Sequence, residues 1–220
     1  MATALITGAN RGIGLELCRH LSERGDRVIA ACRRASPDLE GLGVRVIDDV
    51  DVSSDDSVRS LAQKLEGERI DVLVNNAGIL EPTSLENLDW DAIRRQFEVN
   101  SLGPLRVTQA VLPALADGAK IAIITSRMGS IGDNGSGGSY GYRMSKAAVN
   151  MAGASLAVDL KPRGIAVALL HPGFVRTDMV ARQGHVEPAD AAAQLIQRID
   201  ELTVETSGGF WHANGETLPW

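Results

Sequence analysis

The stretch ALITGANRGIG, residues 4–14, decides the fold. The residues before its first glycine are typical of a buried strand, and the glycines predict a tight turn. A helix follows the turn, because Ile13, Leu17 and Leu21 recur at four-residue steps. A second β-rich run comes next at Arg27–Ala31. The order strand, turn, helix, strand is a βαβ unit, which requires a parallel sheet.

The same alternation continues along the rest of the chain. Short apolar runs predict strands at Ala4–Thr7, Arg27–Ala31, Val44–Asp48, Asp71–Asn75, Lys120–Thr125, Ile165–Leu170 and Phe210–Asn214. Longer helical patterns cover Asp55–Leu65, Asp89–Leu115, Tyr140–Leu160 and Pro188–Leu202. We therefore expect one α/β domain spanning residues 1–220. It is a single-domain, Rossmann-type, doubly wound parallel sheet of about seven strands with helices on both faces.

Composition excludes several classes of function. A net charge of −6 and 4% aromatic residues give no basic or stacking surface for nucleic acid, and no attraction to anionic membranes. No apolar stretch approaches the length of a membrane span, and no basic and apolar leader precedes the first strand. The two cysteines, Cys18 and Cys32, lack metal-ligand spacing, so we expect packing thiols, no metal and a cytoplasmic location.

The glycine turn is a candidate phosphate cradle. It places backbone N–H groups and the positive end of a helix where a diphosphate can sit. Its spacing, Gly-x-x-x-Gly-x-Gly, departs from the general dinucleotide fingerprint, so a purely structural turn is the alternative. Its place at the head of a βαβ unit favours dinucleotide binding.

The end of the second strand indicates which nicotinamide cofactor fits. An acidic residue there suits the ribose of NAD, whereas an arginine suits the 2′-phosphate of NADP. This chain has Cys32, Arg33 and Arg34, and Arg11 lies in the glycine turn. We therefore expect NADP(H), with NAD(H) the less favoured cofactor; the alternative is that the arginines are merely solvated.

Tyr142 and Lys146 are the candidate catalytic pair. They are four residues apart on a predicted helix, so their side chains share one face. Acid–base work near neutral pH needs the tyrosine pKa about three units below its usual value of about 10. An ammonium about 4 Å away can supply that shift, so we expect Lys146 to lower the pKa of Tyr142. Ser126, at the end of the fifth strand, can reach the same carbonyl oxygen, or it can simply cap the strand.

Taken together, these motifs resemble the short-chain dehydrogenase/reductase family. The residues that carry the resemblance, in matching order over nearly the whole chain, are Thr7–Gly14, Asn75-Asn76-Ala77-Gly78, Asn100, Ser126, Tyr142 with Lys146, and Pro172-Gly173. Arg176–Met179 and Gly215–Trp220 are similar to the small carbonyl-reductase group within it, which also includes a signalling protein.

The resemblance implies a mechanism and a set of binding residues. Hydride passes from nicotinamide to a carbonyl carbon, Tyr142 protonates the oxygen, Ser126 polarises it, Lys146 also binds the ribose, and Asn100 completes a water-mediated proton relay. The implied cofactor-binding residues are Gly8, Asn10, Arg11, Gly12, Ile13, Gly14, Arg33, Asp51, Val52, Asn76, Ala77, Gly78, Tyr142, Lys146, Pro172, Gly173, Val175 and Thr177.

Two local features sharpen this expectation. Pro104 cannot donate to the Asn100 carbonyl, which leaves that carbonyl free to hold the relay water. The short stretch Val180–Glu187 leaves no room for the helical lid of longer relatives, so we expect an open pocket for bulky ketones, aldehydes or quinones. That pocket is bounded by Leu80, Ser126, Tyr142, Gly173 and Met179.

The expected partners are small molecules and a second copy of the chain. The predicted helix around Met151 is rich in small residues, so it either packs tightly on the sheet or meets another subunit. Family habit favours a homodimer, with a tetramer as an alternative. A sensor or signalling protein that binds NAD(P) without needing turnover is the alternative function, although intact Ser126, Tyr142 and Lys146 favour a reductase.

Overall fold

The structure, a computed structural model, describes all residues from Met1 to Trp220. Its centre is one parallel sheet in the order β3-β2-β1-β4-β5-β6-β7. Leu5 of β1 lies opposite Ile29 of β2 and Leu73 of β4. The strands are β1 (Thr3–Thr7), β2 (Arg27–Ala31), β3 (Arg45–Ile47), β4 (Ile70–Asn75), β5 (Leu115–Ile124), β6 (Ala166–His171) and β7 (Phe210–His212).

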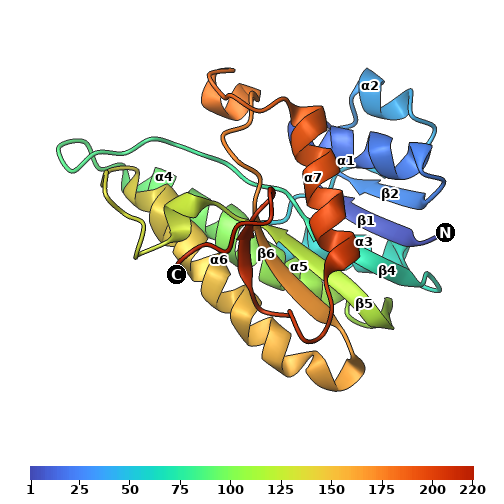
Figure 1. The fold of residues 1–220 in the computed structure, drawn as a ribbon. Helices are drawn as coiled ribbons and strands as arrows, with labels where there is room; N and C mark the ends of the chain where they lie inside the picture. Colours follow the sequence, from blue (N-terminus) through green and yellow to red (C-terminus); the bar gives the residue numbers. More distant parts are fainter.

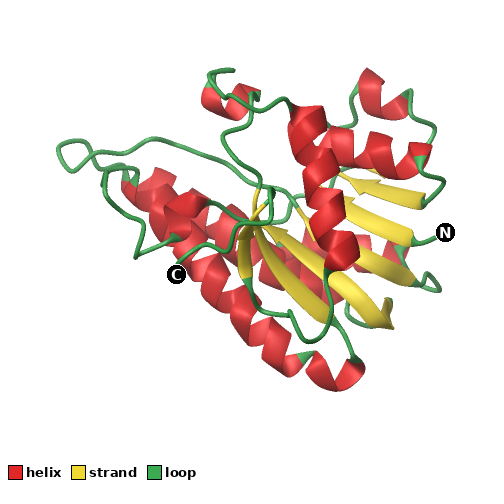
Figure 2. Ribbon diagram, in the orientation of Figure 1, coloured by secondary structure: helices red, strands yellow, loops and turns green.

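Helices cover both faces of this sheet, which confirms the predicted Rossmann-type fold (Figures 1 and 2). One face carries α1 and α7, which lie side by side in Figure 1. The other face carries α3, α5 and the long helix α6. The helices are α1 (Gly12–Glu23), α2 (Pro37–Glu40), α3 (Asp55–Lys64), α4 (Trp90–Phe97), α5 (Gly103–Val111), α6 (Tyr140–Asp159) and α7 (Pro188–Glu201).

The strand order fixes where a ligand can bind. From β1 the chain winds outward to β2 and β3, and then returns to continue on the other side of β1 with β4. Such a reversal opens a crevice outside the carboxyl ends of the two central strands. Those ends carry Thr7 with the glycine turn, and Asn75 with the loop that follows it. None of the helices is both long and apolar enough to cross a membrane.

One predicted helix is wrong. The pattern over Asp89–Leu115 predicts a single helix, but the structure divides it into α4, a π-helical turn η1 (Glu98–Leu102) and α5. The N–H of Gly103 donates to the Glu98 carbonyl, five residues earlier. Gly103 also packs so closely on Val52 that an added Cβ would lie 2.9 Å from its Cγ2 atom. The widened turn sits where Pro104 removes a backbone donor.

The other differences lie at element ends. The structure begins β5 at Leu115, five residues before the predicted start at Lys120, because this early segment still pairs with β4 across an irregular register. The predicted strands Val44–Asp48 and Phe210–Asn214 are shorter, as β3 and β7. Sequence reasoning did not identify α2 or the 3₁₀ turns η2 (Arg127–Gly129), η3 (Lys161–Arg163) and η4 (Asp178–Val180).

Candidate active site

A cavity of about 670 Å³ runs along the carboxyl ends of the strands. It is lined at one end by the glycine turn and by Cys32 and Arg33, which follow β2, and at the other by α6 and the segment before α7. The residues expected to bind a cofactor that line it are Gly8, Asn10, Arg11, Gly12, Ile13, Arg33, Asp51, Val52, Asn76, Ala77, Gly78, Tyr142, Lys146, Pro172 and Thr177. Gly14, Gly173 and Val175 do not line it.

The glycine turn is held against the loop that follows β4. Gly8 has a φ of 65°, and a Cβ added there would lie 2.8 Å from the Cα atom of Ala77. A Cβ on Gly14 would lie 2.3 Å from the Gly8 carbonyl oxygen. The Asn76 amide donates to the carbonyls of Thr7 and Gly8, at 3.0 and 3.1 Å. These contacts allow only glycine at both positions and fix the path of the turn.

The same turn presents uncapped donors to the cavity. Helix α1 begins at Gly12, and its N-cap residue Arg11 makes no side-chain cap. The first N–H groups of a helix lack partners within the helix, and the helix dipole makes this end positive. On the opposite wall, Thr177 lies so close that its Cγ2 atom would be 3.2 Å from a Cβ on Gly12. The geometry suits an anion held between the turn and Thr177.

Arginines lie in the turn and after the end of β2. Arg11 and Arg33 are exposed at the cavity, and neither takes part in an ion pair within 4.0 Å. Partial burial raises the pKa of nearby Asp51, but hydrogen bonds from Ser53 and the charges of Arg33 and Arg106 lower it by more. The net pKa is lowered, so this carboxylate stays ionised. This end of the cavity therefore carries cations free to meet a second anionic group.

Tyr142 and Lys146 line the other end, on one face of α6. Both are buried, with the ammonium nitrogen 5.7 Å from the centre of the phenol ring. The Lys146 ammonium donates to the Ile124 carbonyl at 2.8 Å, and burial lowers its pKa to about 8. Burial also raises the pKa of Tyr142 to about 12, although a hydrogen bond with Ser126 acts the other way. The expectation that Lys146 lowers the tyrosine pKa is wrong here, because loss of solvation sets the pKa of this phenol and the Ser126 hydrogen bond is what opposes it.

Ser126 follows β5 and begins the 3₁₀ turn η2. Its hydroxyl accepts the N–H of Met128 at 3.1 Å, so it caps this turn. A side-chain hydrogen bond between Ser126 and Tyr142 lowers the pKa of the tyrosine, so the two hydroxyls lie near each other. Ser126 is 7% exposed and does not line the cavity itself. Capping and contact with Tyr142 therefore occur together, and the two predicted roles do not compete.

Asn100 lies in the π-helical turn η1, behind Tyr142 and Lys146. Its side-chain amide accepts the Ile79 N–H at 2.8 Å and donates to the Ile79 carbonyl at 2.9 Å. It also donates to the hydroxyl of Ser145 at 3.1 Å. Asn100 is 1% exposed and does not reach the cavity. Its side chain therefore holds the loop after β4 and touches the helix that carries Tyr142.

The segment before α7 contributes cavity residues beyond the cofactor-binding and substrate residues predicted above. Arg176, Asp178, Arg182 and Glu187 line the cavity because residues 174–187 fold back on themselves. Gly184 sits against the backbone of Val175, and this close approach closes the loop. The sequence of this segment gave no signal of a fold-back. Of the predicted substrate pocket, Tyr142 and Met179 line the cavity, whereas Leu80, Ser126 and Gly173 do not.

The chain is similar to known proteins in both sequence and fold. The family model described as short chain dehydrogenase matches residues 2–188. A 1-hydroxy-2-glutathionyl-2-methyl-3-butene dehydrogenase of Rhodococcus sp. (strain AD45) is 47% identical over 226 residues, and the match covers all of both chains. The carbonyl reductase Sniffer of D. melanogaster superposes with a TM-score of 0.94 at 31% identity, and again both chains are covered completely.

A second solved structure extends this likeness. The NADPH-bound carbonyl reductase from chicken fatty liver superposes with a TM-score of 0.91 at 29% identity, covering all of this chain and 99% of that one. The family match, the relative and both structures each cover most or all of this chain. The resemblance is thus confirmed, and the chain belongs to the short-chain dehydrogenase family.

Proposed function

We propose that this protein transfers hydride between NADP(H) and a ketone, aldehyde or quinone carbonyl, or in reverse from an alcohol, with Tyr142 as proton donor and acceptor. One observation carries the proposal. Tyr142 and Lys146, both buried, line the same cavity as the glycine turn and the free cations Arg11 and Arg33. A single elongated ligand with two phosphate groups and a reactive ring fits that arrangement.

The residues present fit NADP(H). The glycine turn offers uncapped N–H groups to a diphosphate, and a Cβ at Gly8 or Gly14 would collide with neighbouring backbone and displace the turn. Arg11 and Arg33 supply charge for a 2′-phosphate, and no acidic residue at the end of β2 favours the ribose of NAD instead. When bound, the nicotinamide supplies or accepts the hydride. The NADPH-bound carbonyl reductase that superposes on this chain supports the same choice.

The two pKa shifts favour proton donation by Tyr142. With a pKa of about 12, the phenol keeps its proton at neutral pH and can deliver it to a carbonyl oxygen that gains charge. Ser126 adds a second hydroxyl beside that oxygen. Lys146, with a pKa of about 8, is still mostly protonated at pH 7 and can return a proton to the phenolate. Asn100 would then hold the water that restores the proton to Lys146.

The substrate side of the cavity favours bulky molecules. Residues 178–180 form only a short 3₁₀ turn over it, and Met179 is 40% exposed. We therefore infer an open pocket in which Tyr142 and Met179 line the cavity at the reacting carbonyl, with Leu80, Ser126 and Gly173 behind this lining. The relative from Rhodococcus acts on a hydroxy compound with a glutathionyl group, which agrees with a pocket that admits large substituents.

A homodimer is the proposed assembly, with a tetramer as a further possibility for the same faces. Exposed apolar side chains gather on the outer side of α6 and of the adjoining η1 and α5. They are Met151 and Val158 on α6, with Leu102 and Leu105 beside the π-helical turn. Pairing of these helices in two copies would remove that apolar area from water.

The test is consumption of NADPH over a panel of ketones, aldehydes and quinones, with NADP⁺ and thioether alcohols for the reverse reaction. Tyr142→Phe removes only the proton donor. We expect kcat to fall at least about 100-fold, the usual contribution of a general acid, while the Kd for NADPH stays within about twofold. The matched control is Tyr140→Phe, since Tyr140 is exposed and has Met144 where Tyr142 has Lys146.

Two outcomes would contradict the proposal. Equal turnover in wild type and Tyr142→Phe would remove the tyrosine from the chemistry. A wild-type protein that binds NADPH tightly but consumes none with any substrate would instead favour a sensor or signalling role.

A further inference from the structure

A buried serine lies between the two candidate catalytic residues. Ser145 is 0% exposed, three residues after Tyr142 and one before Lys146. Its hydroxyl donates to the Tyr142 carbonyl at 2.8 Å and accepts the Asn100 amide at 3.1 Å. A bond to the carbonyl one turn earlier is common for a helical serine. The bond from Asn100 is different, since it joins α6 to a separate element.

A second bond joins the same two elements at the same place. The hydroxyl of Ser101 donates to the carbonyl of Ser145 at 2.7 Å. Ser101 is 4% exposed, so both contacts between η1 and Ser145 are shielded from water. Two neighbouring residues of η1 thus hold both the side chain and the backbone of one residue of α6.

The π-helical turn explains how both neighbours reach one residue. Successive residues of an α-helix point about 100° apart, which spreads two neighbours such as Asn100 and Ser101 around the helix axis. A π-turn adds a residue to the turn and brings neighbours closer to one side. The irregularity in the chain is therefore tied to these two hydrogen bonds.

We propose that Ser145, held by Asn100 and Ser101, is a positioning residue that sets the rotation of α6 and so aims Tyr142 and Lys146 into the cavity. Tyr142, three residues before Ser145, and Lys146, one residue after it, lie on the same helix and must turn with it. A rotation of a few degrees would move the phenol by a large part of an ångström, and proton transfer depends strongly on such distances. This inference rests on the proposed function only for its effect on turnover; the geometry itself can be measured without a substrate.

The experiment compares Ser145→Ala with Ser145→Cys. Alanine removes both hydroxyl bonds, whereas cysteine keeps the volume and bonds only weakly. We expect kcat to fall about tenfold in both variants, with the Kd for NADPH within about twofold, because the glycine turn is untouched. Ser155→Ala, an exposed serine on the same helix, is the matched control and should behave as wild type.

A second readout needs no turnover. The chain has only two tyrosines, so protein labelled with 3-fluorotyrosine gives two ¹⁹F resonances, and Tyr140→Phe identifies them. We expect the Tyr142 resonance to shift or broaden in Ser145→Ala while that of Tyr140 stays in place. Ser101→Ala keeps the Asn100 bond and should show the same change to a smaller extent, with kcat about threefold lower. It also serves if Ser145→Ala does not fold.

Three results would overturn the proposal. Full turnover in Ser145→Cys would mean that Ser145 acts through its volume. An unchanged Tyr142 resonance in both Ser145→Ala and Ser101→Ala would mean that the bonds do not set its position. A fall in NADPH affinity equal to the fall in kcat would indicate general loosening of the fold. If wild type proves inert while the resonance moves as expected, the proposed function fails and the positioning inference stands.

Discussion

The two ends of the cavity are built by opposite means. At the glycine turn, backbone packs against backbone, Gly14 lies on the carbonyl of Gly8, and the nearby cations are exposed and unpaired. At α6, the working groups are side chains that water scarcely reaches, and hydrogen bonds tie Lys146 to the Ile124 carbonyl and Ser145 to Asn100. Phosphate binding needs donors at the surface and close backbone approach, whereas proton transfer needs groups whose solvation and position are fixed. Substitutions at the first end should change affinity, and those at the second should change rate.

The largest expected effect is at the glycine turn. Gly14→Ala would place a Cβ 2.3 Å from the Gly8 carbonyl oxygen and 2.5 Å from the Asn76 amide nitrogen. The Gly8 backbone cannot move away easily, and the Asn76 amide is held by two hydrogen bonds, so the turn must shift. We expect the Kd for NADPH to rise more than about 100-fold, and the free energy of unfolding to fall by about 3 kcal/mol. Fluorescence titration and urea denaturation measure these two quantities.

Gly135→Ala is the control for that substitution, because a Cβ at Gly135 meets nothing within 4 Å. Binding of NADPH within about threefold of wild type by Gly14→Ala would show that the close packing of the turn does not form the cradle.

Arg33 tests the cations at the same end. Arg33→Gln removes a charge that can pair with a 2′-phosphate but leaves the diphosphate cradle intact. We expect the Kd for NADPH to rise about 10- to 100-fold while that for NADH is unchanged, since only NADPH carries the extra phosphate. Titration calorimetry with both cofactors measures the difference. Arg59→Gln on exposed α3 is the control; an equal loss for both cofactors would assign Arg33 to the adenosine rather than the phosphate.

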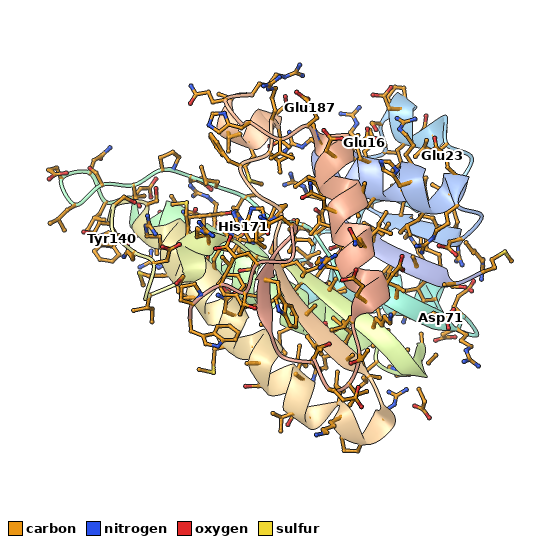
Figure 3. All side chains as sticks on the ribbon, viewed as in Figure 1. Glu16, Glu23, Asp71, Tyr140, His171 and Glu187 are labelled. Carbon is orange, nitrogen blue, oxygen red and sulfur yellow. The ribbon has the colours of Figure 1, made fainter.

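At the buried end of the cavity, His171 should make the free energy of unfolding depend on pH. It is the last residue of β6 and is partly buried (Figure 3). Its ring lies 5.0 Å from that of His212. Burial lowers the pKa of His171 to about 3, and the charges of His212, Arg127 and Lys146 act in the same direction. The unfolded chain, with a histidine pKa near 6.5, therefore takes up a proton as the pH falls while the folded protein does not.

The stability given by neutral His171 is fully present above pH 6.5 and is lost progressively as the pH falls toward 3. Between pH 7 and pH 5 the free energy of unfolding should fall by about 2 kcal/mol from this group. His171→Asn should remove that part of the pH dependence, measured by urea denaturation at the two pH values. Exposed His185→Gln is the control. An unchanged slope in His171→Asn would mean that the imidazole is protonated in the folded protein.

Local spacing made the fold and most of the cavity predictable. The apolar run before Gly8 and the helical repeat after it indicate the βαβ unit. Tyr142 and Lys146 share a face because four residues nearly complete a helical turn. Such patterns involve neighbours in sequence. They need no knowledge of what packs over them.

The parts that sequence reasoning missed depend on distant contacts. The pKa of Tyr142 is set by its burial and not by the charge one turn away. Ser145 is an ordinary helical serine until Asn100 and Ser101 are placed against it. Arg182 reaches the cavity only because the chain folds back after Thr177. Helical periodicity continues smoothly through Asn100, so Pro104 is the one local sign of an irregularity and does not show that it is a π-turn.

The smallest expected effect lies in that π-turn. Pro104 offers no N–H at the position from which a regular helix would donate to the Asn100 carbonyl. In Pro104→Ala a donor returns, and it would compete with a water held on that carbonyl. Proline at the start of α5 is well tolerated, and alanine is a good helix former, so stability should hardly change. We expect kcat to fall about threefold and the Kd for NADPH to stay within about twofold, as for a group that serves the relay and not the cofactor.

Steady-state kinetics on Pro104→Ala measure this effect, with exposed Pro162→Ala after α6 as the control. A fall in kcat without loss of NADPH affinity would show that Pro104 affects the rate, as residues at the buried end of the cavity do, although it lies in a different element from Tyr142. Unchanged turnover would mean that Pro104 serves only to end the π-turn. In that case the restored N–H leaves the proton route undisturbed, and Asn100 acts through its side chain, by holding Ile79 and Ser145.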